Sequence, residues 1–577
     1  MQILPLTECN LPLHLKPNDS SILKYVKKKA NRVKCNENKA AKYYYKIDGS
    51  GRSLTYVDKN GVLITSKKLS NVKCFYRTFD RKGTSDNYLQ FGRFRPLPPK
   101  LDLNELSADF VSVECRKFKK FIVYKNNHFY PSTVRRVKRE EENDERISVV
   151  ILVLESLSRL NYLRFMQQTK QALESMGNIF YLEGLTKLAD NSFPNMTPFL
   201  TGLRARPNEF PNNISYNGPY DELPFLWKDF AAKGYKTSLI EEHPKITLYN
   251  YLARGFLHKP VDWYPRPYWI RVFQENTRRR DFCYNYQPLV EIFLEQKKQF
   301  LRKMKSSPIF MFSFYIEVTH NDFNNVQLID SHYANFIQEF KDQLNSTIFI
   351  LMGDHGNRYG AVLETFIGKV ESRMPLFAMH LPEKLLQKHS HLKHFLELNK
   401  QRLTTWLDVH RTLLDVAAAN YSIIRDKSKS RSYSVWRQAV PLDRNCAEAL
   451  IPESYCVCDQ REELNVSDAK VQKAAEVLVL KLNAILKQEK KCKKLFLHEI
   501  KSCSLIYHSH ALINKEKQSE RRYELVIDVK PSNAVFRGQV IEKSGEWEQR
   551  TEISRINAYK DQSYCVNDRF LKKFCFC

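Results

Sequence analysis

The spacing of hydrophobic and polar positions changes near residue 147. Before that point, apolar residues alternate with polar ones in short segments, which is typical of strands that bury one face. Strand patterns of this kind occupy residues 62–69, 109–118 and 120–125. The sequence therefore predicts a mostly β region over residues 1–145, which ends in a charged stretch (135–146) with the composition of an exposed linker.

From Ile147 onward, continuous apolar runs alternate with helical patterns. The runs at 147–154, 308–318 and 347–353 are mostly apolar, as in strands of a parallel sheet that is covered on both faces. Amphipathic helices are predicted between these runs, for example over 158–177 and 332–344. The alternation predicts a doubly wound α/β domain over residues 146–440.

The last part of the chain, residues 441–577, predicts a small cysteine-rich α+β region. Residues 471–491 have a helical pattern, and residues 522–543 have the pattern of a β-hairpin. A chain of 577 residues is too long for one hydrophobic core, which agrees with a division into three regions.

The net charge of the chain indicates which kind of partner it attracts. The chain carries 92 Lys and Arg against 64 Asp and Glu, a formal charge of +28. Such an excess favours anionic partners. The basic runs are spread along the chain as on solvated surfaces, and none has the aromatic interleaving of a nucleic-acid site. We expect an anionic substrate, such as an ester of a glycan or a lipid headgroup, and no specific nucleic acid.

The thirteen cysteines indicate an oxidising compartment. There is no C-x-x-C pair, so Cys456-x-Cys458 and Cys575-x-Cys577 resemble disulfide cysteines more than zinc ligands, and the odd total leaves at least one cysteine without an internal partner. Six Asn-x-Ser/Thr sequons add little, since roughly four would arise by chance; they lie at Asn18, Asn195, Asn213, Asn345, Asn420 and Asn465.

The N-terminus has no signal-peptide pattern, and no stretch has the length of a transmembrane helix. We expect an extracellular or secretory-pathway protein whose native start is missing from this sequence; the alternative is an intracellular protein. Oligomeric state stays open.

Candidate ligands for a metal stand where apolar strands end. Asp354 and His355 follow the run 347–353, and glycines nearby are expected to let the chain turn as it leaves the sheet. Glu155 follows the first apolar run. Open α/β sheets bind ligands at the carboxyl ends of their strands. Glu, Asp and His together suit one divalent metal, Zn²⁺ or Mn²⁺ rather than Ca²⁺. The alternative is an Asp-His pair that only caps a turn.

Ser192 is the candidate nucleophile. It stands in "DNSFPNMTPFLTG", just before a proline, where a hydroxyl can open a helix. A divalent cation lowers the pKa of a hydroxyl, and a helix N-terminus stabilises anionic oxygens. The alternative is a serine that only caps the helix.

A strand-end acid, a loop serine and a late G-D-H-G resemble the alkaline phosphatase and sulfatase superfamily. More closely, the chain resembles the animal sulfatase-like family catalogued as Domain of Unknown Function 229. Nearly the whole chain carries the resemblance, in "LESLSRLNYLRFMQQT", "DNSFPNMTPFLTG", "VTHNDFN", "LMGDHGNRYG", "VESRMPLFAMHLP" and the closing "CFC". It implies an alkaline phosphatase/sulfatase-like α/β fold.

The resemblance also implies roles. Glu155, Ser192, Asp354 and His355 match the metal-and-nucleophile set, most like that of the one-metal phosphoglycerol and phosphoethanolamine transferases. His320 matches a histidine that contacts the ester and is expected to protonate the leaving group; a strand-end histidine held only by hydrogen bonds is the alternative. The remaining candidates for supporting or substrate contacts are Asn195, Asp322, Arg358 and Glu371.

Two departures from the family pattern bear on activity. Glu155 stands where Asp is usual and reaches one methylene further. The C-x-P-x-R signature of formylglycine sulfatases is absent at Ser192. The leading hypothesis is a metal-dependent hydrolase or transferase that acts on a phosphate, phosphodiester or sulfate ester through Ser192. The alternative is a catalytically inactive, secreted sulfatase-like protein that binds acidic glycans.

Overall fold

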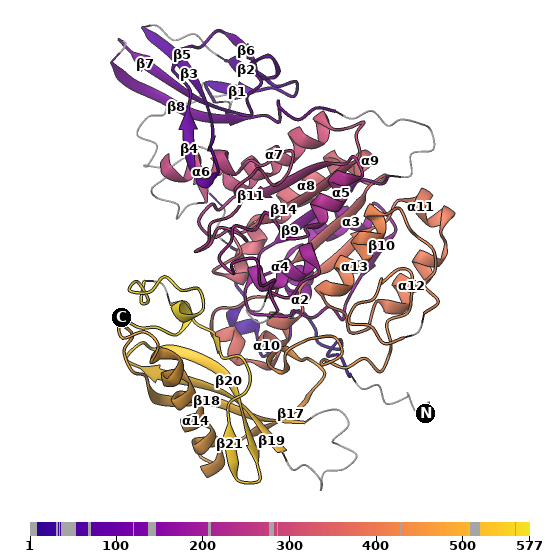
Figure 1. The fold of residues 1–577 in the computed structure, drawn as a ribbon, viewed down its shortest axis with the longest axis vertical. Coiled ribbons are helices and arrows are strands. Elements are labelled where there is room, and N and C mark those ends of the chain that lie inside the picture. Colours follow the sequence, from indigo (N-terminus) through magenta and orange to yellow (C-terminus); the bar gives the residue numbers. More distant parts are fainter. Residues whose placement is uncertain are drawn as a thin grey trace.

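The protein is described here from a computed structural model. It describes residues 9–30, 33, 35, 53–66, 71–118, 120–136, 146–205, 209–275, 282–285, 287–426, 428–507, 520–559 and 561–577. Most of the predicted linker, residues 137–145, lies outside these ranges. Figure 1 shows a central α/β region between a β-rich N-terminal region and a smaller α+β C-terminal region.

The central sheet has six strands in the order β10-β16-β15-β9-β14-β11. Strands β11, β14, β9 and β15 pair in parallel, and β16 pairs antiparallel with β15 and β10. Their bounds are β9 Val149–Leu154, β10 Ile179–Tyr181, β11 Lys236–Glu241, β14 Ile309–Tyr315, β15 Ile348–Gly353 and β16 Phe377–His380. The three apolar runs named above form β9, β14 and β15 at the centre of the sheet.

Alternate residues of β9 enter two different hydrophobic clusters. Ile151 and Val153 pack with α4, α5 and α13, whereas Val150 and Leu152 pack with α3, α6, α7 and α8. Helices therefore cover both faces of the sheet, and the predicted doubly wound α/β fold is confirmed. The central helices are α2 Arg159–Phe165, α3 Gln167–Glu174, α4 Ser192–Thr201, α5 Leu226–Ala232, α6 Arg266–Glu275, α7 Leu289–Lys303, α8 Asp330–Glu339, α9 Lys341–Leu344, α10 Phe366–Arg373, α11 Glu383–Lys388, α12 His391–Asn399 and α13 Trp406–Ala417.

The helix predicted over 158–177 is two helices. Met166, with φ −107° and ψ 49°, separates α2 from α3. After the break, the amides of the second and third residues of α3 donate to the carboxylate of Asp330 at the start of α8 (Gln168 N 3.1 Å, Thr169 N 2.8 Å). A contact with a residue so distant in the sequence overrides the continuous amphipathic pattern.

The N-terminal region contains two antiparallel sheets, with strand orders β1-β2-β6 and β4-β3-β7-β8, β5 pairing with β3. The three strand patterns predicted here correspond to β2, β7 and β8. The elements are β1 Thr55–Val57, β2 Val62–Thr65, β3 Val72–Lys82, β4 Ser85–Phe91, β5 Arg95–Pro96, β6 Lys100–Asp102, α1 Leu103–Leu106, β7 Phe110–Lys117 and β8 Phe121–Phe129. A short ribbon, β12 Cys283–Tyr284 with β13 Gln287–Pro288, precedes α7.

The C-terminal sheet packs on the central region at the edge where the site lies. Helix α14 covers one face of the sheet through Leu478 and Leu482. Val526 and Val535 on the other face pack with Val362 and Ile367 beside α10 (Figure 1). The predicted helix and hairpin are confirmed as α14 and the pair β19–β20. Bounds are β17 Gln460–Leu464, α14 Ala469–Leu486, β18 Phe496–Tyr507, β19 Glu520–Lys530, β20 Ala534–Lys543, β21 Glu546–Glu548 and β22 Ser554–Arg555.

Disulfides connect the regions. Six are formed by described cysteines, and Cys503 is free and buried; the pairs are Cys9–Cys458, Cys35–Cys283, Cys74–Cys115, Cys446–Cys456, Cys492–Cys575 and Cys565–Cys577. The cysteines of both C-x-C motifs are disulfide-bonded, each to a partner outside its own motif. Six disulfides are consistent with an oxidising compartment. No described helix is both long and apolar enough to cross a membrane.

Candidate metal and nucleophile site

Glu155, Asp354 and His355 meet because β9 and β15 are neighbouring parallel strands. Leu154 and Gly353, the last residues of these strands, are directly paired, so the chain leaves both strands at the same edge. The two nearby glycines are required for close packing. A Cβ on Gly353 would lie 2.1 Å from the carbonyl oxygen of Leu157, and one on Gly356 would lie 1.7 Å from that of Glu371. Only Gly360, with φ +99°, serves the turn that the sequence suggested.

The three side chains form a buried donor set. Their ligand atoms all lie within 4.8 Å of one another. Asp354 Oδ2 is 3.1 Å from His355 Nε2, and His355 Nε2 is 3.7 Å from Glu155 Oε1. Ser156 N donates to Asp354 Oδ1 (2.9 Å), while Asp354 Oδ2 and His355 Nε2 are buried without a hydrogen-bond partner.

The hydrogen bond of His355 fixes which ring nitrogen faces this set. Nδ1 lies 2.8 Å from the carbonyl oxygen of Gly356, which can only accept, so Nδ1 carries the proton. Nε2 therefore presents its lone pair to the two carboxylates, as in a histidine that binds a metal.

The charges of this set are poorly balanced by its neighbours. Burial raises the pKa of Glu155, which Arg358 and Ser192 only partly offset. Burial and then the charge of Glu155 raise the pKa of Asp354. Burial lowers the pKa of His355 well below its usual range. Two carboxylates and a neutral imidazole with unbonded, converging atoms fit a divalent cation, and the mixed oxygen and nitrogen donors favour Zn²⁺ or Mn²⁺ over Ca²⁺.

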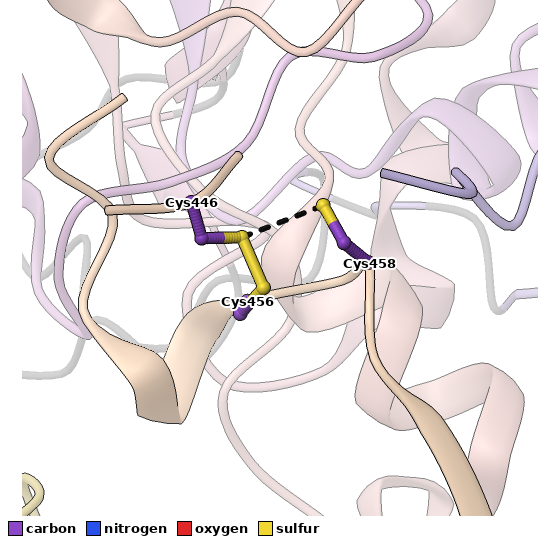
Figure 2. A group of neighbouring side chains, drawn as sticks. All are labelled: Cys446, Cys456 and Cys458. Atoms are coloured by element: carbon purple, nitrogen blue, oxygen red, sulfur yellow. Dashed lines mark hydrogen bonds between the residues drawn. A yellow bond between two sulfur atoms is a disulfide. The ribbon is translucent and has the colours of Figure 1, made fainter. Parts of the chain in front are cut away.

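Two cysteine groups also have ligand-like spacing, but they bind no metal. Figure 2 shows one of them, in which Cys446 is disulfide-bonded to Cys456 and Cys458 lies beside it. Cys458 is itself bonded to Cys9. The sulfur atoms of the second group are also in disulfides; this group is Cys492, Cys565 and Cys575. The carboxylate-imidazole set is thus the one group of this kind, within the described ranges, that keeps its ligand atoms available.

Ser192 is the first residue of α4, and its Oγ donates a hydrogen bond to Glu155 Oε2 at 2.9 Å. The first amides of a helix have no partner within it, so this end carries a partial positive charge. Pro194, the third residue of the helix, lacks an N–H where none is needed. Asn191 precedes the helix as its N-cap residue without a capping bond from its side chain.

Asn195 holds the loop before Ser192. Its Oδ1 accepts from the amides of Leu188 (2.8 Å) and Ala189 (3.2 Å), and its Nδ2 donates to the carbonyls of Ala189 and Asn191. Asn195 is completely buried, so its sequon is inaccessible in the folded chain. The Asn195 side chain thus holds in place the loop that leads to Ser192.

Arg358 and His320 complete the site on the other side of Glu155. Arg358 Nη2 lies 3.9 Å from Glu155 Oε1 and 3.3 Å from His320 Nε2, and its Nη1 donates to Asn191 Oδ1. Burial and then the charge of Arg358 lower the pKa of His320 to about 4. His320 is therefore neutral near pH 7.

The other two candidates face different partners. Asp322 forms an ion pair with Lys27 (2.6 Å) and caps a 3₁₀ helix, Phe323–Leu328. Glu371 is buried and pairs with Arg164 (2.5 Å), and it also accepts from Ser158 Oγ (2.8 Å). Neither lines the cavity that opens over Ser192.

That cavity has a volume of about 440 Å³ and lies between the central and C-terminal regions. Eight Lys or Arg residues line it against four Asp or Glu residues. The sequence analysis missed most of these cations, among them Lys187, Arg555 and Arg569. Lys187 stands close to the Ser192 motif in the chain, and the C-terminal cations belong to the "NDRFLKKFCFC" stretch or its neighbours. Basic residues are so common here that composition alone could not select them.

Family comparison agrees with the resemblance inferred above. The family described as "Protein of unknown function (DUF229)" matches residues 28–501. The chain belongs to this family. A comparison with curated proteins gave no match.

Several solved structures are similar to this chain. The zinc complex of the C-terminal periplasmic domain of EcEptC from Escherichia coli is 15% identical over 48% of this chain and 84% of that one, with a TM-score of 0.33. Phosphonate monoester hydrolase SpPMH from Silicibacter pomeroyi is 10% identical over 70% and 90%, with a TM-score of 0.35. An alkaline phosphatase superfamily protein from Vibrio parahaemolyticus is 13% identical over 76% and 86%, with a TM-score of 0.34. At these scores and identities, the assignment of chemistry depends on the geometry of the site.

Proposed function

We propose that this protein is a metal-dependent hydrolase or transferase of phosphate, phosphodiester or sulfate esters, with Ser192 as the nucleophile. The observation that carries the proposal is the bond from Ser192 Oγ to Glu155, whose carboxylate belongs to the buried set with Asp354 and His355. Glu155, Asp354 and His355 would hold one Zn²⁺ or Mn²⁺. When bound, the cation supplies Lewis acidity, which lowers the pKa of a nearby hydroxyl and withdraws charge from an ester oxygen.

The side chains of this protein would perform the transfer as follows. Ser192 Oγ attacks the phosphorus or sulfur atom and forms a new ester bond, while the bond to the leaving oxygen breaks. The hydroxyl proton of Ser192 points at Glu155 Oε2. Arg358 and the amides that begin α4 face the non-bridging oxygens, which gain charge in the transition state. Because His320 is neutral near pH 7, it would have to take up the proton that Ser192 releases before it could protonate the leaving oxygen; water or an acceptor hydroxyl then releases the group from Ser192.

The surroundings of Ser192 favour an anionic substrate, such as an ester on a glycan or a lipid headgroup. The excess of cations in the cavity has the sign that attracts such molecules. We place the protein outside the cell or in the secretory pathway, because the disulfides need an oxidising compartment and five of the six sequons are exposed. These five are available for glycosylation.

The first test is elemental analysis of purified wild type beside the double variant Asp354→Asn, His355→Ala. We expect about one Zn or Mn per wild-type chain and none in the variant. Activity is then compared on 4-nitrophenyl phosphate, bis(4-nitrophenyl) phosphate and 4-nitrophenyl sulfate. Ser192→Ala should abolish turnover, whereas Ser390→Ala, at an exposed serine that precedes α12, should not. Turnover that survives in Ser192→Ala would exclude this mechanism.

One observation favours a second candidate, a secreted binder of acidic glycans without catalysis. The carboxylate beside Ser192 comes from a glutamate, whose extra methylene changes how far it reaches toward a metal. In this case wild type would bind a sulfated glycan such as heparin, and the Glu155→Gln and Asp354→Asn variants would bind it equally well. If wild type turns over an ester, and these two variants lose that turnover but still bind the glycan, the result would instead support the enzyme.

A further inference from the structure

The cavity wall opposite the central sheet contains a cation that the proposed chemistry does not use. Arg569 belongs to the C-terminal region and lines the same cavity as Ser192. Its guanidinium carbon lies 4.9 Å from the ring centroid of Phe193, the residue that follows Ser192. The guanidinium therefore lies on the ring of the residue next to the nucleophile, in the same cavity.

Arg569 lacks the polar partners that its neighbours have. All three of its side-chain nitrogens are buried without a hydrogen bond, and it forms no ion pair with a described carboxylate. By contrast, Arg555 on the same wall donates to Asn557, Gln562 and a backbone carbonyl. Arg204 pairs with Glu209 at 2.9 Å. An unpartnered buried cation is costly, because its hydration is lost without replacement.

Aromatic rings support this cation without satisfying its N–H groups. Phe193 is packed edge-on against Tyr216 and Tyr249, with ring centroids 5.6 and 5.7 Å away. The Tyr220 hydroxyl donates to the carbonyl of Tyr216 at 2.8 Å and is a weak polar contact of Arg569, whose charge and side-chain contact both oppose the burial that raises the pKa of Tyr220. The planar fork of Arg569 keeps donors available for a bidentate oxyanion.

The segment that carries Arg569 is rigidly fixed. Asp568 Oδ1 accepts from the amides of Phe570 (2.9 Å) and Leu571 (2.8 Å), which sets the turn at Arg569. Two disulfides, Cys565–Cys577 and Cys492–Cys575, hold the segment on either side. Because Arg569 is held in place before any ligand binds, little ordering cost would oppose an incoming anion.

We propose that Arg569 binds a second oxyanion of the substrate, so that the preferred substrate carries two anionic groups: the ester that reacts at Ser192 and a phosphate, sulfate or carboxylate that rests on Phe193 and Arg569. This inference rests on the proposed function, because it places the reacting ester at Ser192. The substrate class is then an ester with a second, separate anionic group, and the C-terminal region is its selectivity element.

The test uses three matched sugars. Glucose 6-phosphate offers one anionic group, 6-phosphogluconate adds a carboxylate, and glucose 1,6-bisphosphate adds a phosphate. Binding is measured by calorimetry on the full chain carrying Ser192→Ala, which prevents turnover. We expect at least one of the two sugars with a second anionic group to bind about 10-fold or more tighter than glucose 6-phosphate, well beyond the roughly twofold gain from offering two equivalent groups. The sugar that binds more tightly identifies the chemistry of the second group.

Arg569→Gln should remove that preference while changing glucose 6-phosphate binding by less than about twofold. Arg569→Lys, which keeps the charge and loses the planar fork, should retain part of it. The matched control is Arg550→Gln, at an exposed arginine of the same region that pairs with Glu548. The thermal midpoint of Arg569→Gln should equal or exceed that of its parent, since an unpartnered buried charge is removed.

Three outcomes would overturn the proposal. Equal binding of all three sugars by the parent protein would exclude a second subsite. Equal weakening of all three by Arg569→Gln would assign Arg569 to the reacting group itself. Unchanged binding with a lower thermal midpoint would make Arg569 a structural cation on its aromatic neighbours. Binding is scored whether or not Ser192 reacts, so failure of the proposed function leaves this result readable.

Discussion

Two buried carboxylate groups face the same cavity, and their surroundings balance them in opposite ways. Glu155 lies beside Asp354, and burial raises the pKa of both. Glu524 on β19 is equally buried, and burial alone would raise its pKa, but Arg461, Arg373 and Lys369 hold it well below its usual range. Arg373 Nη2 lies 2.9 Å from Glu524 Oε2, and Arg461 donates to Oε1.

The contrast distinguishes a structural cluster from the cluster that we propose as the active site. The charge of Glu524 is more than matched by protein cations, so this cluster joins the C-terminal sheet to α10 and needs nothing from outside. Among the described residues, the only Lys or Arg that forms an ion pair with Glu155 or Asp354 is Arg358, at 3.9 Å from Glu155, and the unbonded atoms of the pair converge. Perturbed pairs of this second kind cluster at functional sites.

Removing each carboxylate should therefore have opposite consequences, and the largest effect concerns activity. We expect Glu155→Gln to lower kcat/KM on bis(4-nitrophenyl) phosphate at least ~10³-fold, equal to about 4 kcal/mol of transition-state stabilisation. In the metal-free protein its thermal midpoint should not fall, because a poorly compensated buried charge is removed. A midpoint that drops as far as that of Glu524→Gln would end the distinction between the two groups.

The second prediction concerns Glu524→Gln and the stability of the fold. Loss of this charge leaves Arg373, Arg461 and Lys369 buried without their counter-charge, so the free energy of unfolding should fall by about 3–5 kcal/mol. Urea unfolding measures the change, with Glu546→Gln at an exposed site on β21 as the control. If Glu524→Gln were as stable as wild type, water or other groups would already screen these cations.

A smaller effect should come from metal itself. At a free Zn²⁺ or Mn²⁺ concentration 100 times its Kd, binding to the folded state adds about 2.7 kcal/mol of stability. We expect this gain in wild type, its loss in Asp354→Asn and its retention in Asp322→Asn, because Asp322 pairs with Lys27 instead. Thermal unfolding with and without metal provides the measurement. Loss of the gain in Asp322→Asn would bring that residue back into the site.

The sequence located the centre of the site because its determinants are local. A run of apolar residues forms a buried strand, and the residues that follow it must emerge at the sheet edge; this reasoning placed Glu155, Asp354 and His355 together. The same locality explains what could not be predicted. Arg569 reaches Phe193 from 376 residues away in the chain. Met166 interrupts an amphipathic pattern because α3 also contacts Asp330. One cysteine of each C-x-C motif pairs with a distant residue, Cys458 with Cys9 and Cys575 with Cys492.

The comparison extends to buried histidines, and His128 gives the smallest predicted effect. Its Nε2 lies 2.8 Å from Thr55 Oγ1 inside the N-terminal region, and burial lowers its pKa to about 3. The unfolded chain, with a histidine pKa near 6.5, therefore binds a proton that the folded chain refuses between pH 6.5 and 3. The stability that depends on neutral His128 is complete above pH 6.5 and is lost as pH falls, by about 2 kcal/mol at pH 5.

The His128→Asn variant tests this loss. It should have a smaller free energy of unfolding than wild type at pH 7, and urea unfolding should show the difference between the two proteins narrowing by this amount at pH 5. His498→Asn, at an exposed site, should show no narrowing. If the difference in unfolding free energy between wild type and His128→Asn were the same at both pH values, His128 would take up its proton while the chain stays folded.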